Sequence, residues 1–142
     1  MPTPTDTFTL EGHVGFLLRK AHQRHAAIFV ESAAEHGLTP TQFAALWKVT
    51  ELGKATQNQL GRSVAMDPAT IQGVVRRLTE RGLLARADDP MDRRTTVLTP
   101  TAMGRDLLIA VVACAQRAHD AALSPLTRDE RAQFLSLLRK LG

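Results

Sequence analysis

The sequence predicts a mainly α-helical domain that carries one small β-hairpin. Apolar residues recur at three- and four-residue steps in six segments, the period of amphipathic helices. Between the fourth and fifth of these segments, the β-branched run Thr95-Thr96-Val97 follows a turn rich in aspartate, which is typical of a hairpin. A chain of 142 residues fits a single domain, 1–142, and is long enough to bury a core.

The first two helices are expected at residues 10–36 and from Pro40 onward. Gly37 follows the first helix as a stop signal. Thr39 suits the N-cap of the second helix, because its hydroxyl can accept a free backbone N–H, and proline is tolerated at the first helical position. Gly53 ends this helix. Its buried face is expected to comprise Phe43, Leu46, Trp47 and Val49 or Thr50.

Two short helices should follow, separated by a tight turn. Thr56 is the expected N-cap of the third helix, which Met66 closes, and Asp67 is the expected N-cap of the fourth, which Gly82 ends. The fourth helix has one apolar stripe, consisting of Ile71, Val74, Val75 and Leu78. Residues 83–99 then form the hairpin. A long fifth helix runs from Thr101 to about Ala122, and Thr127 caps the last helix.

Composition limits the classes of function. The net charge is +4. Residues 53–99 hold eight basic and five acidic side chains, so this third of the chain carries most of the excess of positive charge. A local basic excess favours a polyanionic partner. The single cysteine, Cys114, excludes an internal disulfide and fits the reducing cytoplasm. We expect neither a secretory signal nor a membrane span, because no apolar run approaches about 20 residues.

The third helix, the fourth helix and the hairpin together predict a winged helix-turn-helix. A helix in the major groove of double-stranded DNA needs small and polar residues at its N-terminal end. The fourth helix offers these at Pro68, Ala69, Thr70, Gln72 and Gly73, and one turn later it offers Arg76 and Arg77. Gln72 can pair with adenine, and Arg76 can reach a guanine edge or a phosphate, whereas Arg77 suits a phosphate. An ordinary amphipathic helix with a solvated polar face is the alternative.

The hairpin tip presents Arg93 and Arg94. Arginine is the side chain preferred in the narrow, electronegative minor groove. Asp92 lies two residues before Arg94, and we expect its carboxylate to hold that guanidinium through two hydrogen bonds. A solvated turn without a partner is the other interpretation of this tip.

Residues 38–108 resemble the MarR family of bacterial transcriptional regulators. The resemblance is most specific from Leu78 and the Gly82-Leu83 pair through Asp92-Arg93-Arg94 to Leu98-Thr99, with Gly104 after it. It implies an obligate homodimer whose interface is formed by residues 10–36 and 101–142, and a DNA-binding lobe at residues 38–100. It further implies a repressor of a pseudo-palindromic operator, released by phenolic or aromatic carboxylate ligands, with DNA contacts from residues 68–77 and from Arg94 with Arg93 beside it. No cofactor is implied.

An effector site is expected between the dimer helices and the winged lobe. Cationic or hydrogen-bonding groups beside an aromatic wall suit a benzoate-like or heteroaromatic carboxylate. The candidate lining residues are His13, Phe16, Leu17, Arg19, Lys20 and His22 on the first helix and Phe43 and Trp47 on the second. Two alternatives stay open for the histidines, namely the start of a metal site at His22 and His25 and a solvated role without a ligand.

Enzymatic activity is not expected. The sequence has no nucleophile elbow, phosphate-binding glycine loop or zinc signature, and the aspartates of residues 88–92 fall in an exposed turn. A winged-helix module that binds another protein is the second alternative, since a fold does not fix a function. Such a module would not need to display Gln72, Arg76 and Arg94 together.

Overall fold

The computed structural model describes residues 1–142 and confirms the predicted fold class, because four helices precede a two-stranded hairpin and two helices follow it. The helices are α1 (Val14–Ser32), α2 (Pro40–Leu52), α3 (Gln57–Ser63), α4 (Pro68–Glu80), α5 (Ala102–Ala122) and α6 (Arg128–Arg139), preceded by the short 3-10 turn η1 (Leu10–Gly12). The strands are β1 (Leu84–Asp89) and β2 (Asp92–Pro100), which pair antiparallel. No helix has the length and apolarity needed to cross a membrane.

Side-chain caps fix where most helices begin. Thr39, Thr56 and Thr127 each form a reciprocal capping box with the residue three positions later. Asp67 and Thr101 cap α4 and α5 by accepting a backbone N–H in the same way. The predicted N-caps at residues 39, 56, 67 and 127 are therefore confirmed, because a cap depends only on neighbouring residues.

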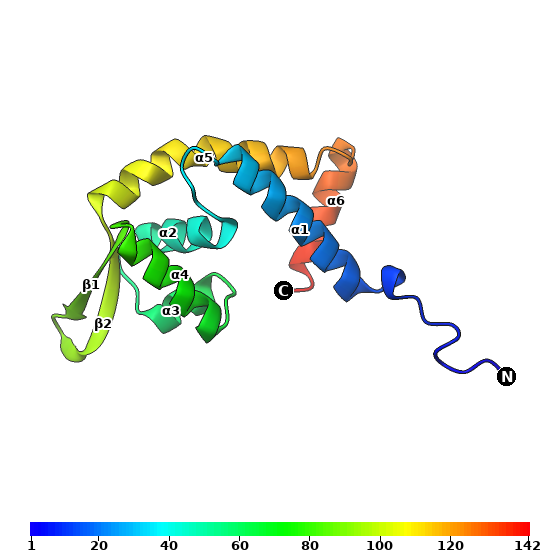
Figure 1. Ribbon diagram of the computed structural model, residues 1–142, viewed down its shortest axis with the longest axis horizontal. Helices are drawn as coiled ribbons and strands as arrows, with labels where there is room; N and C mark the ends of the chain where they lie inside the picture. The colour runs from blue at the N-terminus through cyan, green and yellow to red at the C-terminus, as the bar shows by residue number, and fades with distance from the viewer.

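The helices form two groups, as Figure 1 shows. The long helices α1 and α5 pack against each other, and α6 crosses the end of α5 that is remote from the hairpin. Helices α2, α3 and α4 and the hairpin form a lobe at the other end of α5. The guanidinium of Arg24 on α1 donates hydrogen bonds to the carbonyl oxygens of Ala121 and Ala122, which fixes α1 to the C-terminal end of α5.

The hydrophobic core lies mainly inside the lobe and extends along α5. Its cluster comprises 19 buried residues, with Leu46 and Val49 from α2, Leu60 from α3, and Val75 and Leu78 from α4 among the completely enclosed ones. Helix α5 contributes Leu108, Val111, Cys114 and Ala118 on one face. Cys114 is thus a buried small side chain, as expected. A short β-bridge between Ala55 and Leu98, which was not predicted, joins the α2–α3 connection to β2 within the lobe.

The outer helices leave apolar surface uncovered in a single chain. On α1, Val14, Leu17 and Leu18 are 62%, 50% and 43% exposed, and Leu137 on α6 and Leu141 just after it are 50% and 71% exposed. The predicted first helix, 10–36, was too long, because His13 is extended and separates η1 from α1, and residues 33–37 turn back toward α2. An apolar periodicity continues through such breaks, so it cannot locate them.

The expectation that Trp47 belongs to the buried face of α2 is wrong. Its side chain is 45% exposed, while the buried residues of this helix are Gln42, Ala45, Leu46 and Val49. These positions follow the spacing of one helix face, and Trp47 lies one step of about 100° beyond Leu46. Gln42 is buried although polar, because its amide closes the capping box with Thr39.

Candidate functional site

Helix α4 presents a polar face to solvent. Pro68, Ala69, Thr70 and Gln72 are exposed at its N-terminal end, and Arg76 and Arg77 are exposed one turn later. The opposite face, formed by Ile71, Val74, Val75 and Leu78, is buried in the core. The packing therefore fixes the helix so that its polar and basic residues expected to contact DNA point outward.

Asp67 fixes the first turn of α4. Its carboxylate accepts hydrogen bonds from the backbone N–H of Thr70, at 2.8 Å, and from the Thr70 hydroxyl, at 3.0 Å. These two hydrogen bonds lower the pKa of Asp67, because they stabilise its charged form. The Thr70 hydroxyl donates its proton to Asp67, so its oxygen can only accept a hydrogen bond from a base and its methyl group stays free for a thymine methyl.

The wing is a regular antiparallel hairpin up to its tip. The register pairs Leu84 with Pro100 and Asp88 with Thr96, and an irregularity follows between Asp88 and Asp89. The tip residues, including Arg93 and Arg94, are exposed. The hairpin projects from the body of the lobe (Figure 1), and two adjacent arginines lie close to its tip.

The predicted pairing of Asp92 with the Arg94 guanidinium is wrong. The Asp92 carboxylate instead accepts hydrogen bonds from the backbone N–H of Arg94, at 3.0 Å, and from the hydroxyl of Thr95, at 3.1 Å. An aspartate at a turn readily bonds the backbone two residues on, because that N–H is near and already oriented. Asp92 therefore shapes the turn and leaves the Arg94 side chain without an intramolecular partner.

The arginines of α4 and the wing are free of carboxylates. The one side-chain ion pair of the structure joins Lys48 to Glu51, at 2.8 Å, on α2. Arg76, Arg77, Arg93 and Arg94 make no side-chain hydrogen bond or ion pair within the chain. An unpaired guanidinium can take up a phosphate or a base edge without first breaking an internal contact.

Gly73 is half-buried in the middle of α4, and nothing in the chain requires a glycine there. A Cβ built at this position meets no atom within 4 Å. Glycine in a helix interior costs about 1 kcal/mol relative to alanine. The residue is thus unfavourable for the fold and allows close approach of an external surface.

We expect Gly73→Ala to stabilise the protein by about 0.5–1 kcal/mol, as measured by urea denaturation. The same change should weaken binding to specific DNA about tenfold, comparable to the loss of one base contact, because the new methyl group separates α4 from the groove. A variant that is more stable and binds DNA as well as the parent would show that α4 does not approach DNA at this residue.

The eight residues expected to line an effector site do not converge. Trp47 borders a hollow between α2 and α5, His22 borders a hollow between α1 and the start of α4, and Leu17 lies in a groove between α1 and α6. Phe43 packs between Phe29 and Trp47, with ring centres 5.5 and 6.1 Å away. The remaining four, His13, Phe16, Arg19 and Lys20, line none of these three.

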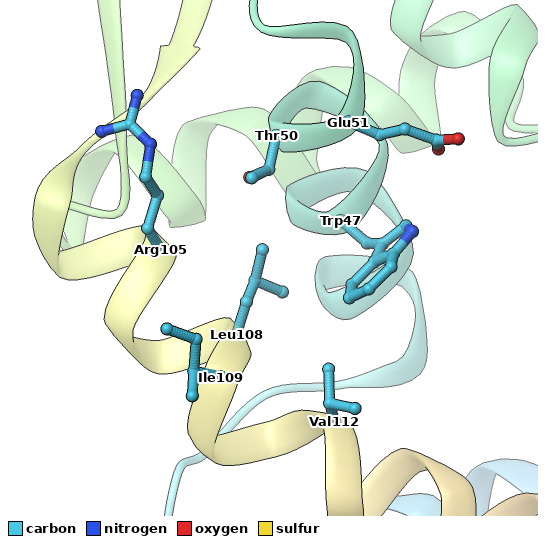
Figure 2. A pocket seen from close by; sticks show the side chains of 7 residues that line it. All are labelled: Trp47, Thr50, Glu51, Arg105, Leu108, Ile109 and Val112. Carbon is cyan, nitrogen blue, oxygen red and sulfur yellow. The ribbon is translucent and has the colours of Figure 1, made fainter.

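The hollow between α2 and α5 encloses about 570 Å³ and is mostly apolar (Figure 2). Trp47 forms one wall, and Leu108, Ile109 and Val112 form the facing wall on α5. Thr50 and Arg105 lie at its rim toward the wing, and the Glu51 carboxylate points outward, where it pairs with Lys48. Arg105 has no carboxylate partner, and its side chain extends from the rim away from Trp47 (Figure 2).

The α5 residues of this hollow were not predicted from the sequence. Arg105 lies one turn into α5, and its place around the same hollow as Trp47 depends on how α5 packs on α2. The apolar period of α5 indicates that Leu108 and Val112 share a face, but it gives no information on which helix that face meets. No local signal could have found the site.

The second hollow, of about 420 Å³, places His22 and His25 of α1 near Asp67 and Thr70 of α4. Partial burial lowers the pKa of His25, and the nearby imidazoles of His22 and His119 lower it further. The neutral imidazole is therefore favoured. No group of three or more histidine, cysteine or carboxylate side chains is arranged to hold a metal ion.

The chain is similar to known transcriptional regulators over nearly its whole length. The model of the MarR family matches residues 38–96, which span the helix-turn-helix and most of the wing. The transcriptional repressor NicR of Pseudomonas putida is 39% identical over 140 residues, covering 99% of this chain and 89% of NicR.

Two solved structures show the same fold. A probable transcriptional regulator from Pseudomonas aeruginosa has 46% identity and a TM-score of 0.89, covering 94% of this chain and 100% of that one. BpsR of Bordetella bronchiseptica, whose DNA binding is regulated by 6-hydroxynicotinic acid, has 36% identity and a TM-score of 0.87, covering 94% of this chain and 96% of BpsR. These similarities extend over nearly the whole chain, and the chain belongs to the MarR family of transcriptional regulators.

Proposed function

We propose that this protein is a transcriptional repressor that binds a pseudo-palindromic DNA operator as a homodimer and is released by a small aromatic or heteroaromatic carboxylate. One observation supports DNA binding most directly. The exposed face of α4 and the tip of the wing both present arginines without intramolecular partners, and the apolar face of α4 is anchored in the core. We place this function in the cytoplasm, where the DNA of a bacterium is found.

The dimer is supported by the uncovered apolar side chains of α1 and α6. A row of half-exposed leucines and valines on two terminal helices favours burial against a second copy, because large apolar patches are uncommon on monomers. We propose an interface formed by residues 10–36 and 101–142. The lobes of the two copies, residues 38–100, then lie on either side of it.

In this dimer, α4 of each copy lies in the major groove. Gln72 and Thr70 contact base edges, Arg76 contacts a guanine or a phosphate, and Arg77 contacts a phosphate. Pro68, Ala69 and Gly73 let the backbone approach. The wing contacts the adjacent minor groove through Arg94, with Arg93 beside it and Asp92 shaping the turn. The two recognition helices should meet successive major grooves about 34 Å apart.

We assign effector binding to the hollow between α2 and α5. The regulation of BpsR by 6-hydroxynicotinic acid supports a heteroaromatic carboxylate. Trp47 offers a face for stacking the ring, and Arg105 offers two N–H groups for its carboxylate. The hollow lies between the dimer helix α5 and the lobe, so a ligand there can alter how the two are joined.

The direct test is a titration of the purified protein against DNA from upstream of its own gene, at several salt concentrations. It is repeated with 6-hydroxynicotinate, nicotinate, benzoate and 4-hydroxybenzoate. Binding that weakens steeply with salt and is abolished by one acid supports the whole proposal. Salt-dependent binding that no acid changes would leave a regulator without the proposed effector class. A lack of specific binding would favour the protein-interaction module.

Arg105→Gln provides a more specific test of the effector hollow. Loss of a charge-assisted hydrogen bond worth about 1.5–3 kcal/mol should raise the effector concentration for half-release about tenfold or more. Operator affinity without effector should stay unchanged, because Arg105 lies outside α4 and the wing. Arg117→Gln, on the same helix but outside the hollow, is the matched control and should respond like the parent. Equal responses of both variants would remove the assignment.

A further inference from the structure

Arg81 joins the end of the recognition helix to a distant part of the chain. It is the C-cap residue of α4, and its backbone N–H bonds the Arg77 and Thr79 carbonyls. Its guanidinium extends to the turn between α1 and α2, residues 33–37, and donates to the carbonyl oxygens of His36, at 2.9 Å, and Gly37, at 3.0 Å. These partners lie 45 and 44 positions away in sequence.

The two carbonyls accept no other hydrogen bond in the structure. Gly37 has a φ of +63°, a left-handed conformation that turns its carbonyl out of the path of a helix. Arg81 has no carboxylate partner. Its planar guanidinium, with parallel N–H groups, matches two adjacent carbonyls in a way that a single ammonium group cannot.

The next two residues make the corresponding contacts at the other connection of the lobe. The Gly82 carbonyl accepts from the Thr101 hydroxyl at 2.6 Å, and the Leu83 carbonyl accepts from the Thr101 backbone N–H at 3.1 Å. The lobe is covalently joined to the dimer helices only through the α1–α2 turn and through the start of α5. Residues 81–83 therefore bond to both connections, directly after α4.

We propose that Arg81 is a positioning residue that fixes the angle of α4 relative to α1, and thereby determines which half-site spacing the dimer accepts. The inference rests on the proposed dimeric repressor. One added base pair moves a half-site by about 3.4 Å and rotates it by about 34°. A lobe whose position is fixed at both connections cannot follow that movement. Without the hydrogen bonds of Arg81, the α1–α2 turn is only a covalent link, and the lobe can pivot about its contacts with α5. No other side-chain hydrogen bond links α4 to the α1–α2 turn.

The first experiment tests, without DNA, how firmly α4 is held relative to α1, by measuring the distance between a label on each helix. Gln23→Cys on α1 and Gln72→Cys on α4 carry spin labels in a Cys114→Ser background, diluted into unlabelled protein so that only distances within one chain are recorded. We expect a narrow distance distribution for the parent and a broader one for Arg81→Gln. Arg77→Gln, one turn earlier on α4, is the matched control and should keep the narrow distribution. An unchanged distribution for Arg81→Gln would overturn the proposal, whatever the protein does on DNA.

The second experiment uses an operator series with one or two base pairs added or removed between the half-sites. One added base pair should weaken the parent about 30-fold or more, but Arg81→Gln less than about fivefold, because a pivoting lobe avoids deforming the DNA. Arg77→Gln should weaken binding equally at every spacing. Equal spacing penalties for Arg81→Gln and the parent would overturn the role in spacing.

The two experiments also separate this inference from the proposed function. If the parent binds no specific DNA, the repressor proposal fails, while the distance measurement still decides whether Arg81 holds α4. Arg81→Lys retains the charge but cannot bond both carbonyls, and it should give an intermediate width and an intermediate spacing penalty. It replaces Arg81→Gln if that variant unfolds.

Discussion

Gly104→Ala is expected to destabilise the fold by about 3 kcal/mol or more, an effect at the upper end for an added methyl group. Gly104 is buried in the first turn of α5, where the helix crosses the start of the hairpin. A Cβ at this position would lie 2.3 Å from the carbonyl oxygen of Leu83 and 3.3 Å from Cδ1 of Leu46. No real Cβ approaches a backbone oxygen so closely, so the backbone must move.

The obstructing carbonyl cannot move without further loss. It accepts the backbone N–H of Thr101, whose hydroxyl in turn accepts the N–H of Gly104 at 3.0 Å. The glycine is therefore required by a close approach and not by its backbone angles. A shift here would also disturb the contact between α5 and the end of α4.

Urea denaturation monitored by circular dichroism measures this effect as a lower midpoint of unfolding. Gly73→Ala is the matched control, since it adds the same methyl group to a helix at a site with nothing within 4 Å. The two substitutions should therefore change stability in opposite directions. A Gly104→Ala variant as stable as the parent would mean that α5 and β1 are further apart in solution.

Arg94→Ala is expected to weaken operator binding by about 1–3 kcal/mol, which is roughly 5- to 150-fold. The side chain is exposed at the wing, and Asp92 bonds its backbone and not its guanidinium. The substitution therefore removes only a contact to an outside partner. Folding and dimerisation should be unaffected, because the wing tip contributes nothing to the core.

Binding measured by fluorescence anisotropy, with sedimentation to monitor the dimer, tests this prediction. Arg94→Lys separates charge from shape, since a compact ammonium enters a narrow minor groove less readily than a guanidinium. Its affinity should lie between those of the parent and Arg94→Ala on an A·T-rich flank. Arg139→Ala on α6 controls for the loss of one positive charge. Normal affinity of Arg94→Ala would exclude the wing from the DNA contact.

Local sequence was sufficient wherever a feature involves residues close together in the chain. The caps at Thr39, Thr56 and Asp67 bond residues three positions away, so composition and spacing reveal them. The polar face of α4 follows from its period in the same way. The order of helices and hairpin, and with it the fold class, is confirmed for this reason.

Two predictions that depended on where a single side chain points were wrong. Asp92 and Arg94 have the spacing of a carboxylate–guanidinium pair, but the nearer backbone N–H competes successfully for the same oxygen. Trp47 is large and apolar, but a helix buries only the face turned toward the core, and its neighbours Leu46 and Val49 occupy that face. Hydrophobicity alone does not select between adjacent positions.

The winged helix-turn-helix, the ends of most helices and the residues on the exposed face of α4 follow from local sequence, because periodicity, caps and turns act over a few residues. Three placements came from the tertiary structure alone: Arg105 and Trp47 around one hollow, Leu83 against Gly104, and the guanidinium of Arg81 on the carbonyls of residues 36 and 37. Each of them brings together segments more than 20 positions apart, which depends on how whole helices pack. Packing of that kind is a property of the complete core, and no short stretch of sequence specifies it.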